Sequence, residues 1–163
     1  ANEMTANIAQ QAKQTGLDFH FDKLIPTNTF DAHRLLHYAA EQGVMDATSE
    51  ALFKGMFTNG LNLADIDTLI NLASEVGLES SEVKAVLNSE RYMDSVRADE
   101  SFARQLKITS VPFFVFDNKY AVSGAQPASV FSEILVKVQE EKARLIQLDN
   151  ASQGPSCSDD ICY

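Results

Sequence analysis

The chain is poor in the residues that mark several classes of protein. Its 163 residues include two cysteines, Cys157 and Cys162, which lie together near the C-terminus and do not make the disulfide framework of a small secreted domain. Lys and Arg number 13 against 23 Asp and Glu, which gives a formal net charge of −10. Nucleic acids and anionic membrane surfaces both attract clustered basic residues, so this balance argues against either as a partner. No apolar run approaches the length of a membrane span.

The first residues also lack a targeting signal. The sequence Ala-Asn-Glu-Met-Thr has neither a basic segment nor an apolar core, so it does not resemble a signal peptide. A chain of this length ordinarily forms one domain, and its apolar content of 45% is normal for a globular protein. We therefore expect a globular protein of the cytoplasm.

The most informative stretch runs from residue 108 to residue 124 and predicts two strands joined by a tight turn. Residues 113–116 are apolar on both alternating faces, which is typical of a strand buried on both sides in the middle of a sheet. Asp117-Asn118 can adopt the positive φ values of a two-residue hairpin turn. Residues 120–123 alternate more weakly, as a strand nearer an edge does. Pro112 lacks an N–H group and therefore suits the first position of the strand.

Helical periodicity dominates the rest of the chain. Glycine, proline and capping residues divide it into segments, among them Asn28 as an N-cap with Asp31 in the first helical turn. Residues 17–21 alternate and predict a short strand or an extended loop. The expected helices span about 2–14, 28–43, 48–58, 65–76, 80–87, 90–106 and 127–146, and their expected inward residues include Leu35, Leu52, Phe53, Met56, Phe57, Leu69, Val96, Leu106, Phe131 and Val138.

Three segments together resemble one family. They are Asn-Thr-Phe-Asp-Ala-His-Arg-Leu-Leu at 28–36, Val-Pro-Phe-Phe-Val at 111–115 and Tyr-Ala-Val-Ser-Gly-Ala-Gln-Pro at 120–127. In this order they resemble the DsbA-like disulfide oxidoreductases of the FrnE type, over roughly residues 1–140. The resemblance implies an α/β fold that is mostly helical as it stands: the C-terminal part of a thioredoxin-like fold with a DsbA-type helical insertion.

The resemblance also divides the chain into parts. Residues 1–27 would follow the βαβ unit that opens a thioredoxin fold, and residues 28–106 would form the helical insertion. Residues 107–146 would form the ββα half of the thioredoxin fold, which contains the cis-proline. Residues 147–163, rich in Asn, Ser, Gly, Pro and Asp, are expected to be a flexible tail.

The resemblance assigns roles to three residues of the expected site. It implies that the Val111–Pro112 bond is cis, and that the backbone of Val111 binds an extended substrate peptide by strand addition. It places His33 beside the groove above the active site. The family's nucleophilic Cys-x-x-Cys is absent from this sequence. The chain therefore resembles a fragment or truncated form without a catalytic residue.

Cys157 and Cys162 are the only candidates for a redox pair. They are either two thiols on a flexible acidic tail or a resolving or regulatory disulfide, since a loop of four intervening residues closes at little entropic cost. Asp159 and Asp160 lie between them, and negative neighbours raise a thiol pKa and slow its attack. Neither reading makes this pair a nucleophilic centre.

His33 and His37 lie at positions i and i+4 of a predicted helix. This spacing can hold zinc, but no Glu follows the first His and no third ligand is evident. We therefore interpret both as ordinary helix residues and expect no metal.

Three functions fit these observations. The first is a fragment of a thiol-disulfide oxidoreductase that acts on protein, peptide or small thiol substrates. The second is a glutathione-dependent isomerase of the kappa-class transferase branch, against which residues 123–126, Ser-Gly-Ala-Gln, argue. The third is a catalytically silent peptide-binding module. We expect no cofactor, with glutathione as one candidate thiol substrate, and a dimer or a complementing N-terminal fragment as partner.

Overall fold

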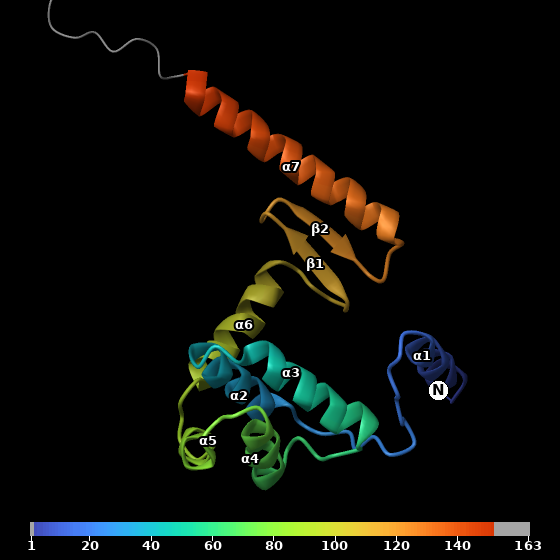
Figure 1. Ribbon diagram of the computed structural model, residues 1–163, viewed down its shortest axis with the longest axis vertical. Coiled ribbons are helices and arrows are strands. Elements are labelled where there is room, and N and C mark those ends of the chain that lie inside the picture. The colour runs from blue at the N-terminus through green and yellow to red at the C-terminus, as the bar shows by residue number, and fades with distance from the viewer. Residues whose placement is uncertain (1, 152–163) are drawn as a thin grey trace, which may run out of the picture. The chain divides into compact units, whose positions relative to one another are not determined.

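The computed structural model describes residues 2–151, and side chains for residues 3–144. The chain divides into two compact units, Ala1–Ala103 and Arg104–Tyr163. The first unit is helical, and the second consists of a hairpin and a long helix (Figure 1).

The helices of the first unit begin and end close to the predicted boundaries. Asp65 caps one of them by accepting a hydrogen bond from the Thr68 N–H at 2.8 Å. Gly77 follows the end of that helix, and its φ of 89° suits a glycine. The elements are α1 Asn2–Gln14, α2 Phe30–Glu41, α3 Met45–Phe53, the π-helical turn η1 Lys54–Thr58, α4 Ile66–Glu75, α5 Ser80–Leu87 and α6 Met93–Gln105, the last of which crosses the unit boundary.

The core of the first unit lies between α2, α3, α4 and α5. Leu35, Leu69, Val83 and Val86 are fully buried, as the apolar periodicity of α2 and α4 predicts for Leu35 and Leu69. Burial of one such side chain contributes about 1.5–3 kcal/mol to folding. The rest of the buried cluster consists of Ala32, Tyr38, Ala39, Leu52, Leu63, Leu72, Ala73, Leu78 and Leu87.

Arg34 is a charged residue inside this core, with 1% of its surface exposed. Its guanidinium donates hydrogen bonds to four main-chain carbonyls in and after α5, those of Val86, Leu87, Ser89 and Arg91. A fifth bond, of 2.8 Å, joins Arg34 Nη1 to the Asp31 carboxylate one helical turn earlier. Arg34 therefore connects α2 to the carbonyl end of α5, where the helix dipole favours a positive charge.

The second unit contains an antiparallel hairpin of β1, Phe113–Phe116, and β2, Tyr120–Ser123. Phe113 pairs with Ser123 and Phe116 pairs with Tyr120. Helix α7, Ala128–Ala151, covers one face of the hairpin, and its Phe131 ring lies 4.8 Å from the Phe114 ring, edge to face. The Tyr120 hydroxyl donates a hydrogen bond to Glu141 on the same helix.

The hairpin turn is one residue longer than predicted. Asp117 and Asn118 have φ values of 51° and 53°, which confirms the predicted positive φ at both positions. The Lys119 N–H then donates to the Phe116 carbonyl at 3.0 Å. Because Phe116 pairs with Tyr120, three residues rather than two join the strands.

The prediction that β1 is buried on both faces is wrong for this chain. Val115 is 43% exposed, and Phe114 is only partly covered despite its contact with Phe131. Within the described residues the sheet has two strands. Since α7 packs on one face of this sheet, β1 lacks the two covered faces that its apolar sequence predicts.

Other details of the helical prediction also change. Phe53 and Leu106, expected inside, are exposed: Phe53 is the last residue of α3, and Leu106 follows the end of α6. The Asn28 side chain accepts from the Phe30 N–H, but the N-cap is Thr29. Residues 17–21 form a loop and turn, not a strand. No helix among residues 2–151 is long and apolar enough to cross a membrane.

Candidate functional site

One candidate site, in the second unit, is the loop that enters β1. The Val111–Pro112 peptide bond is cis, the isomer that the resemblance implies. The Pro112 carbonyl accepts a hydrogen bond from the Gly124 N–H at 2.8 Å, which ties this loop to the end of β2. The Val111 side chain is 86% exposed. The loop thus presents an apolar side chain and its backbone at the surface of the second unit.

The backbone of Val111 has free hydrogen-bonding groups. Its N–H and C=O make no hydrogen bond with any other described residue. Unpaired backbone beside a strand can pair with an extended peptide, with the main chain supplying the affinity. Chemically, the loop can therefore hold a peptide by strand addition.

A second, separate candidate site, in the first unit, surrounds His33. His33 lies on the exposed side of α2, and its main-chain N–H donates to the Thr29 carbonyl at 3.0 Å. Its side chain lines a cleft of about 380 Å³ between the start of α2 and α6. The other lining residues are Asn28, Thr29, Phe30, Val96, Arg97, Asp99 and Glu100.

The charged groups of this cleft are mostly paired. Arg97 Nη1 lies 2.8 Å from the Glu100 carboxylate, and its guanidinium sits 4.4 Å from the centre of the Phe30 ring. His37 Nε2 lies 2.8 Å from Asp99 Oδ2. His33 itself has no ion pair with the described residues. The cleft therefore offers a polar surface with one uncommitted imidazole.

Tyr92 fixes the His37 side chain. The two rings are nearly parallel, with centroids 6.2 Å apart. The Tyr92 hydroxyl donates to Glu41 at 2.6 Å, and burial, followed by this hydrogen bond, raises the pKa of Tyr92 above its usual value. The tyrosine therefore stays protonated at neutral pH and keeps its donor role.

His33 and His37 are on one helix but face different neighbours. His33 lines the cleft, and His37 contacts Asp99 and Tyr92. In the described part of the chain, no group of three His, Cys, Asp or Glu side chains is arranged to hold a metal ion. Cys157 and Cys162 lie outside the described residues, so their predicted pairing and reactivity stay predictions.

Asp99, Tyr92 and Arg97 were not predicted from the sequence as site residues. Asp99 and Arg97 belong to α6, whose helical period says nothing about which residue of α2 it faces. Tyr92 adopts φ of 63°, which is rare for a tyrosine. One signal was available in the sequence, where the aromatic Tyr92 directly precedes α6.

The mostly helical architecture with a small hairpin sheet is that of a thioredoxin-like fold with a helical insertion. A family model for the DsbA-like thioredoxin domain matches residues 1–136, and the chain belongs to this family. The predicted DsbA-like membership and fold class are thereby confirmed.

Two relatives show the extent of this similarity. The uncharacterized protein YwbO of Bacillus subtilis (strain 168) is 29% identical over 138 residues, which are 83% of this chain and 68% of that protein. The crystal structure of a probable DsbA oxidoreductase from Streptomyces coelicolor is 43% identical, with a TM-score of 0.78. That match covers 83% of this chain but spans only 59% of the solved chain.

Proposed function

We propose that this chain is the substrate-binding part of a FrnE-type thiol-disulfide oxidoreductase of the cytoplasm, acting on protein or peptide thiols. The observation that carries the proposal is the exposed loop before β1. There, the N–H and C=O of Val111 are unpaired with any described residue and available to an extended peptide. Membership in the DsbA-like family supports the reaction class.

The reaction requires a thiolate that this chain does not contribute from its described part. A cysteine thiolate attacks one sulfur of a disulfide, forms a mixed disulfide and releases the other sulfur as a thiolate. Both cysteines of the chain lie at positions 157 and 162, next to Asp159 and Asp160. We therefore propose that a strand-Cys-x-x-Cys-helix-strand segment, joined to the chain or separate from it, supplies the nucleophile.

The edge of β1 is the expected attachment point for that segment. β1 pairs with β2 on one edge, and no other described strand pairs with it. A strand with an open edge recruits another strand. We propose that the partner is the Cys-x-x-Cys segment or, in its absence, the β1 of a second copy.

The test is a comparison of three proteins in an insulin-reduction assay and a peptide-oxidation assay. The proteins are the chain alone, its Cys157→Ser, Cys162→Ser double variant, and the chain completed with the Cys-x-x-Cys segment. We expect negligible activity in the first two and clear activity in the third. Strong activity in the chain alone that disappears in the double variant would make the C-terminal thiols the active site.

The role of Val111 has its own test in the completed protein. A substrate peptide N-methylated at the residue that pairs with Val111 should lose affinity, because one main-chain hydrogen bond is removed. Val111→Ala should change affinity little, since recognition uses the backbone. The opposite pattern would show that the valine side chain, not strand addition, binds the peptide.

A catalytically silent binding module is the second candidate function. It is favoured by the absence of cysteine from residues 1–156. A completed protein that binds peptides through Val111 but exchanges no disulfide would support this candidate.

A further inference from the structure

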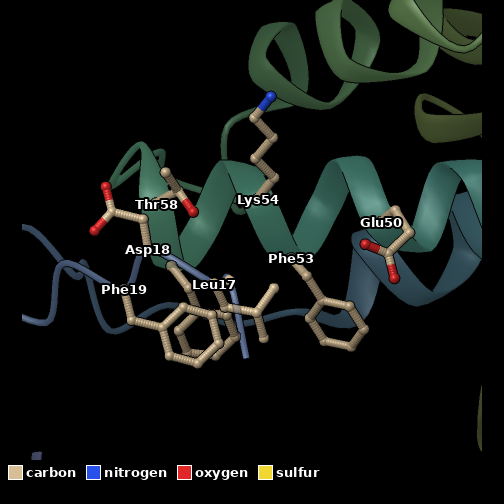
Figure 2. Close-up of a pocket in the computed structure, with 9 residues that line it drawn as sticks. Leu17, Asp18, Phe19, Glu50, Phe53, Lys54 and Thr58 are labelled. Atoms are coloured by element: carbon tan, nitrogen blue, oxygen red, sulfur yellow. The ribbon is translucent and has the colours of Figure 1, made fainter. Parts of the chain in front are cut away.

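A second cleft in the first unit lies apart from the charged groups around His33. It has a volume of about 510 Å³, within the range of sites that hold small ligands or side chains. Residues of the loop after α1 form one wall, and α3 with η1 forms the other (Figure 2). Phe53, on this wall, is 57% exposed.

Aromatic rings line this cleft, hereafter the aromatic cleft. The Phe19 and Phe57 rings lie 5.1 Å apart and are tilted by 32°. The Phe53 and Phe57 rings lie 6.3 Å apart with an angle of 29°. Phe57 thus lies next to both other rings, each tilted by about 30° from it, beside the half-exposed Leu17. A flat apolar group placed on this row of three rings gains contact with aromatic surface that is already in place.

The wall is fixed before any ligand binds. The His20 N–H donates to the Phe57 carbonyl at 2.7 Å, which holds the loop against η1. In η1 the Asn59 N–H bonds to the Lys54 carbonyl at 3.0 Å, the wider spacing of a π-helix. Such turns are frequent at functional sites. A preformed cleft binds with a smaller loss of conformational entropy.

Carboxylates lie at both ends of the aromatic row. Figure 2 shows Asp18 beyond Phe19 at one end and Glu50 beyond Phe53 at the other. Lys54 also lines the cleft, but in this view its amino group extends away from the rings. The lining therefore carries two carboxylates against one lysine, and this excess of negative charge complements a cation. Asp18 Oδ2 lies 3.2 Å from His20 Nε2, so Glu50 is the carboxylate of this cleft without such a partner among the described residues.

The aromatic cleft is connected to the His33 region. A smaller cavity of about 110 Å³ shares Phe53 with the aromatic cleft. The same cavity shares Thr29 and His33 with the cleft of about 380 Å³ between the start of α2 and α6. The aromatic cleft and the cleft beside α6 therefore border the same cavity.

We propose that the aromatic cleft binds a peptide segment in which an aromatic side chain stands next to a lysine or arginine. The aromatic side chain lies on the row of Phe19, Phe57 and Phe53, and the basic side chain lies near the Glu50 or Asp18 carboxylate. This inference rests on the proposed function and adds to it a preference for substrates that combine aromatic and basic residues.

The test uses short cysteine-free peptides with blocked ends. Because the chain contains no tryptophan, the fluorescence of a peptide tryptophan reports binding without a label. A peptide with Trp-Lys should bind saturably, and one with Trp-Glu should bind about two- to fivefold more weakly. Added salt should weaken the Trp-Lys peptide selectively. A peptide with Ala-Lys should fail to displace it.

Two variants locate the site. Phe53→Ala should weaken Trp-Lys binding about tenfold, because it removes the exposed end of the aromatic row. Glu50→Gln should remove most of the difference between the Trp-Lys and Trp-Glu peptides. The matched controls are Phe102→Ala, an equally exposed phenylalanine on α6, and Glu75→Gln, an exposed carboxylate on α4. Both controls should bind like the unmodified chain.

Each other outcome overturns the inference. Equal binding of the two tryptophan peptides refutes the charge preference, and normal binding by Phe53→Ala refutes the location. No saturable binding, or a dimer that dissociates only in Phe53→Ala, shows that the cleft does not serve peptides. Because the peptides carry no thiol, these results stand whether or not the completed protein exchanges disulfides.

Discussion

The Nη2 atom of Arg34 lies 2.7 Å from the main-chain carbonyl oxygen of Val86, 52 residues later in the sequence. This contact belongs to a set in which one guanidinium donates to four main-chain carbonyls of α5 and the following turn. Arginine can do this because it presents five N–H donors in a rigid plane. Lysine, with a single compact ammonium, cannot reach the same set of acceptors.

Arg34→Met is expected to lower the free energy of unfolding by about 3–5 kcal/mol, since it leaves buried carbonyls and Asp31 without their donor. Arg34→Lys should recover only part of this loss. Urea unfolding followed by circular dichroism measures both. Arg97→Met is the control, because its guanidinium is exposed and its pair with Glu100 should contribute no more than about 1 kcal/mol. A loss at Arg34 as small as at Arg97 would contradict a structural role.

Gly60→Ala and Gly43→Ala form a matched pair. Both glycines have left-handed φ, 67° and 74°. A Cβ at Gly60 would lie 2.7 Å from the Lys23 Cβ and 2.8 Å from its carbonyl oxygen, whereas one at Gly43 would meet no atom within 4 Å. Gly43→Ala should therefore cost about 1 kcal/mol and Gly60→Ala at least about 2–3 kcal/mol. Equal losses in urea unfolding would show that the loop at Lys23 moves freely.

The Tyr120–Glu141 pair makes the second unit sensitive to pH. The hydrogen bond from Tyr120 lowers the pKa of Glu141, and the same bond raises the pKa of Tyr120. The Tyr120→Phe variant should therefore move the Glu141 pKa up towards 4.5, its ordinary value. Carboxyl-carbon NMR titration measures this shift. Tyr92→Phe, which removes a hydroxyl bonded to Glu41 instead, should leave Glu141 unchanged.

The direction of the stability change follows from these shifts. A carboxyl group with a lowered pKa contributes stability above its unfolded value of 4.5, and this is lost as the pH falls through the folded pKa. The hydrogen bond from Lys142 lowers the pKa of Asp117, which adds to the loss of stability at acidic pH. The raised pKa of Tyr120 contributes stability below pH 10.0, which is lost as the pH rises further. Thermal unfolding across the pH range should show a loss of stability at both acidic and alkaline pH. Tyr120→Phe should make both losses smaller.

Cys157 and Cys162 are expected to alkylate slowly. Asp159 and Asp160 disfavour the thiolate, so the alkylation rate should rise only near or above the ordinary thiol pKa of about 8.5. Replacing both aspartates with asparagine should shift the rate profile to lower pH. A thiolate present below about pH 6 in the unmodified chain would mean that a positive environment surrounds these residues.

Local signals predicted most of the fold. Asp65 and Gly77 bound α4 because capping and left-handed backbone are properties of single residues. The positive φ values of Asp117 and Asn118 follow for the same reason. The burial of β1 could not be predicted in this way, because it depends on how many layers cover the strand.

The candidate site residues were predictable only where a family pattern indicates the role. Val111 and His33 came from a family pattern, and the structure places one in an exposed loop and the other beside a cleft. The burial of Arg34 was not predicted, because its acceptors are carbonyls more than 50 residues away. The aromatic cleft depends on a π-helical turn that the helical period of its sequence does not reveal.

That turn has an evolutionary consequence. A π-helical turn amounts to one residue inserted into an α-helix, and one α-helical residue corresponds to about 100° of rotation. Deletion of a single residue within 54–58 would restore regular winding and rotate Phe57 relative to Phe53. Insertions and deletions at this point, more than substitutions, would therefore let members of the family acquire or lose this aromatic row in one step.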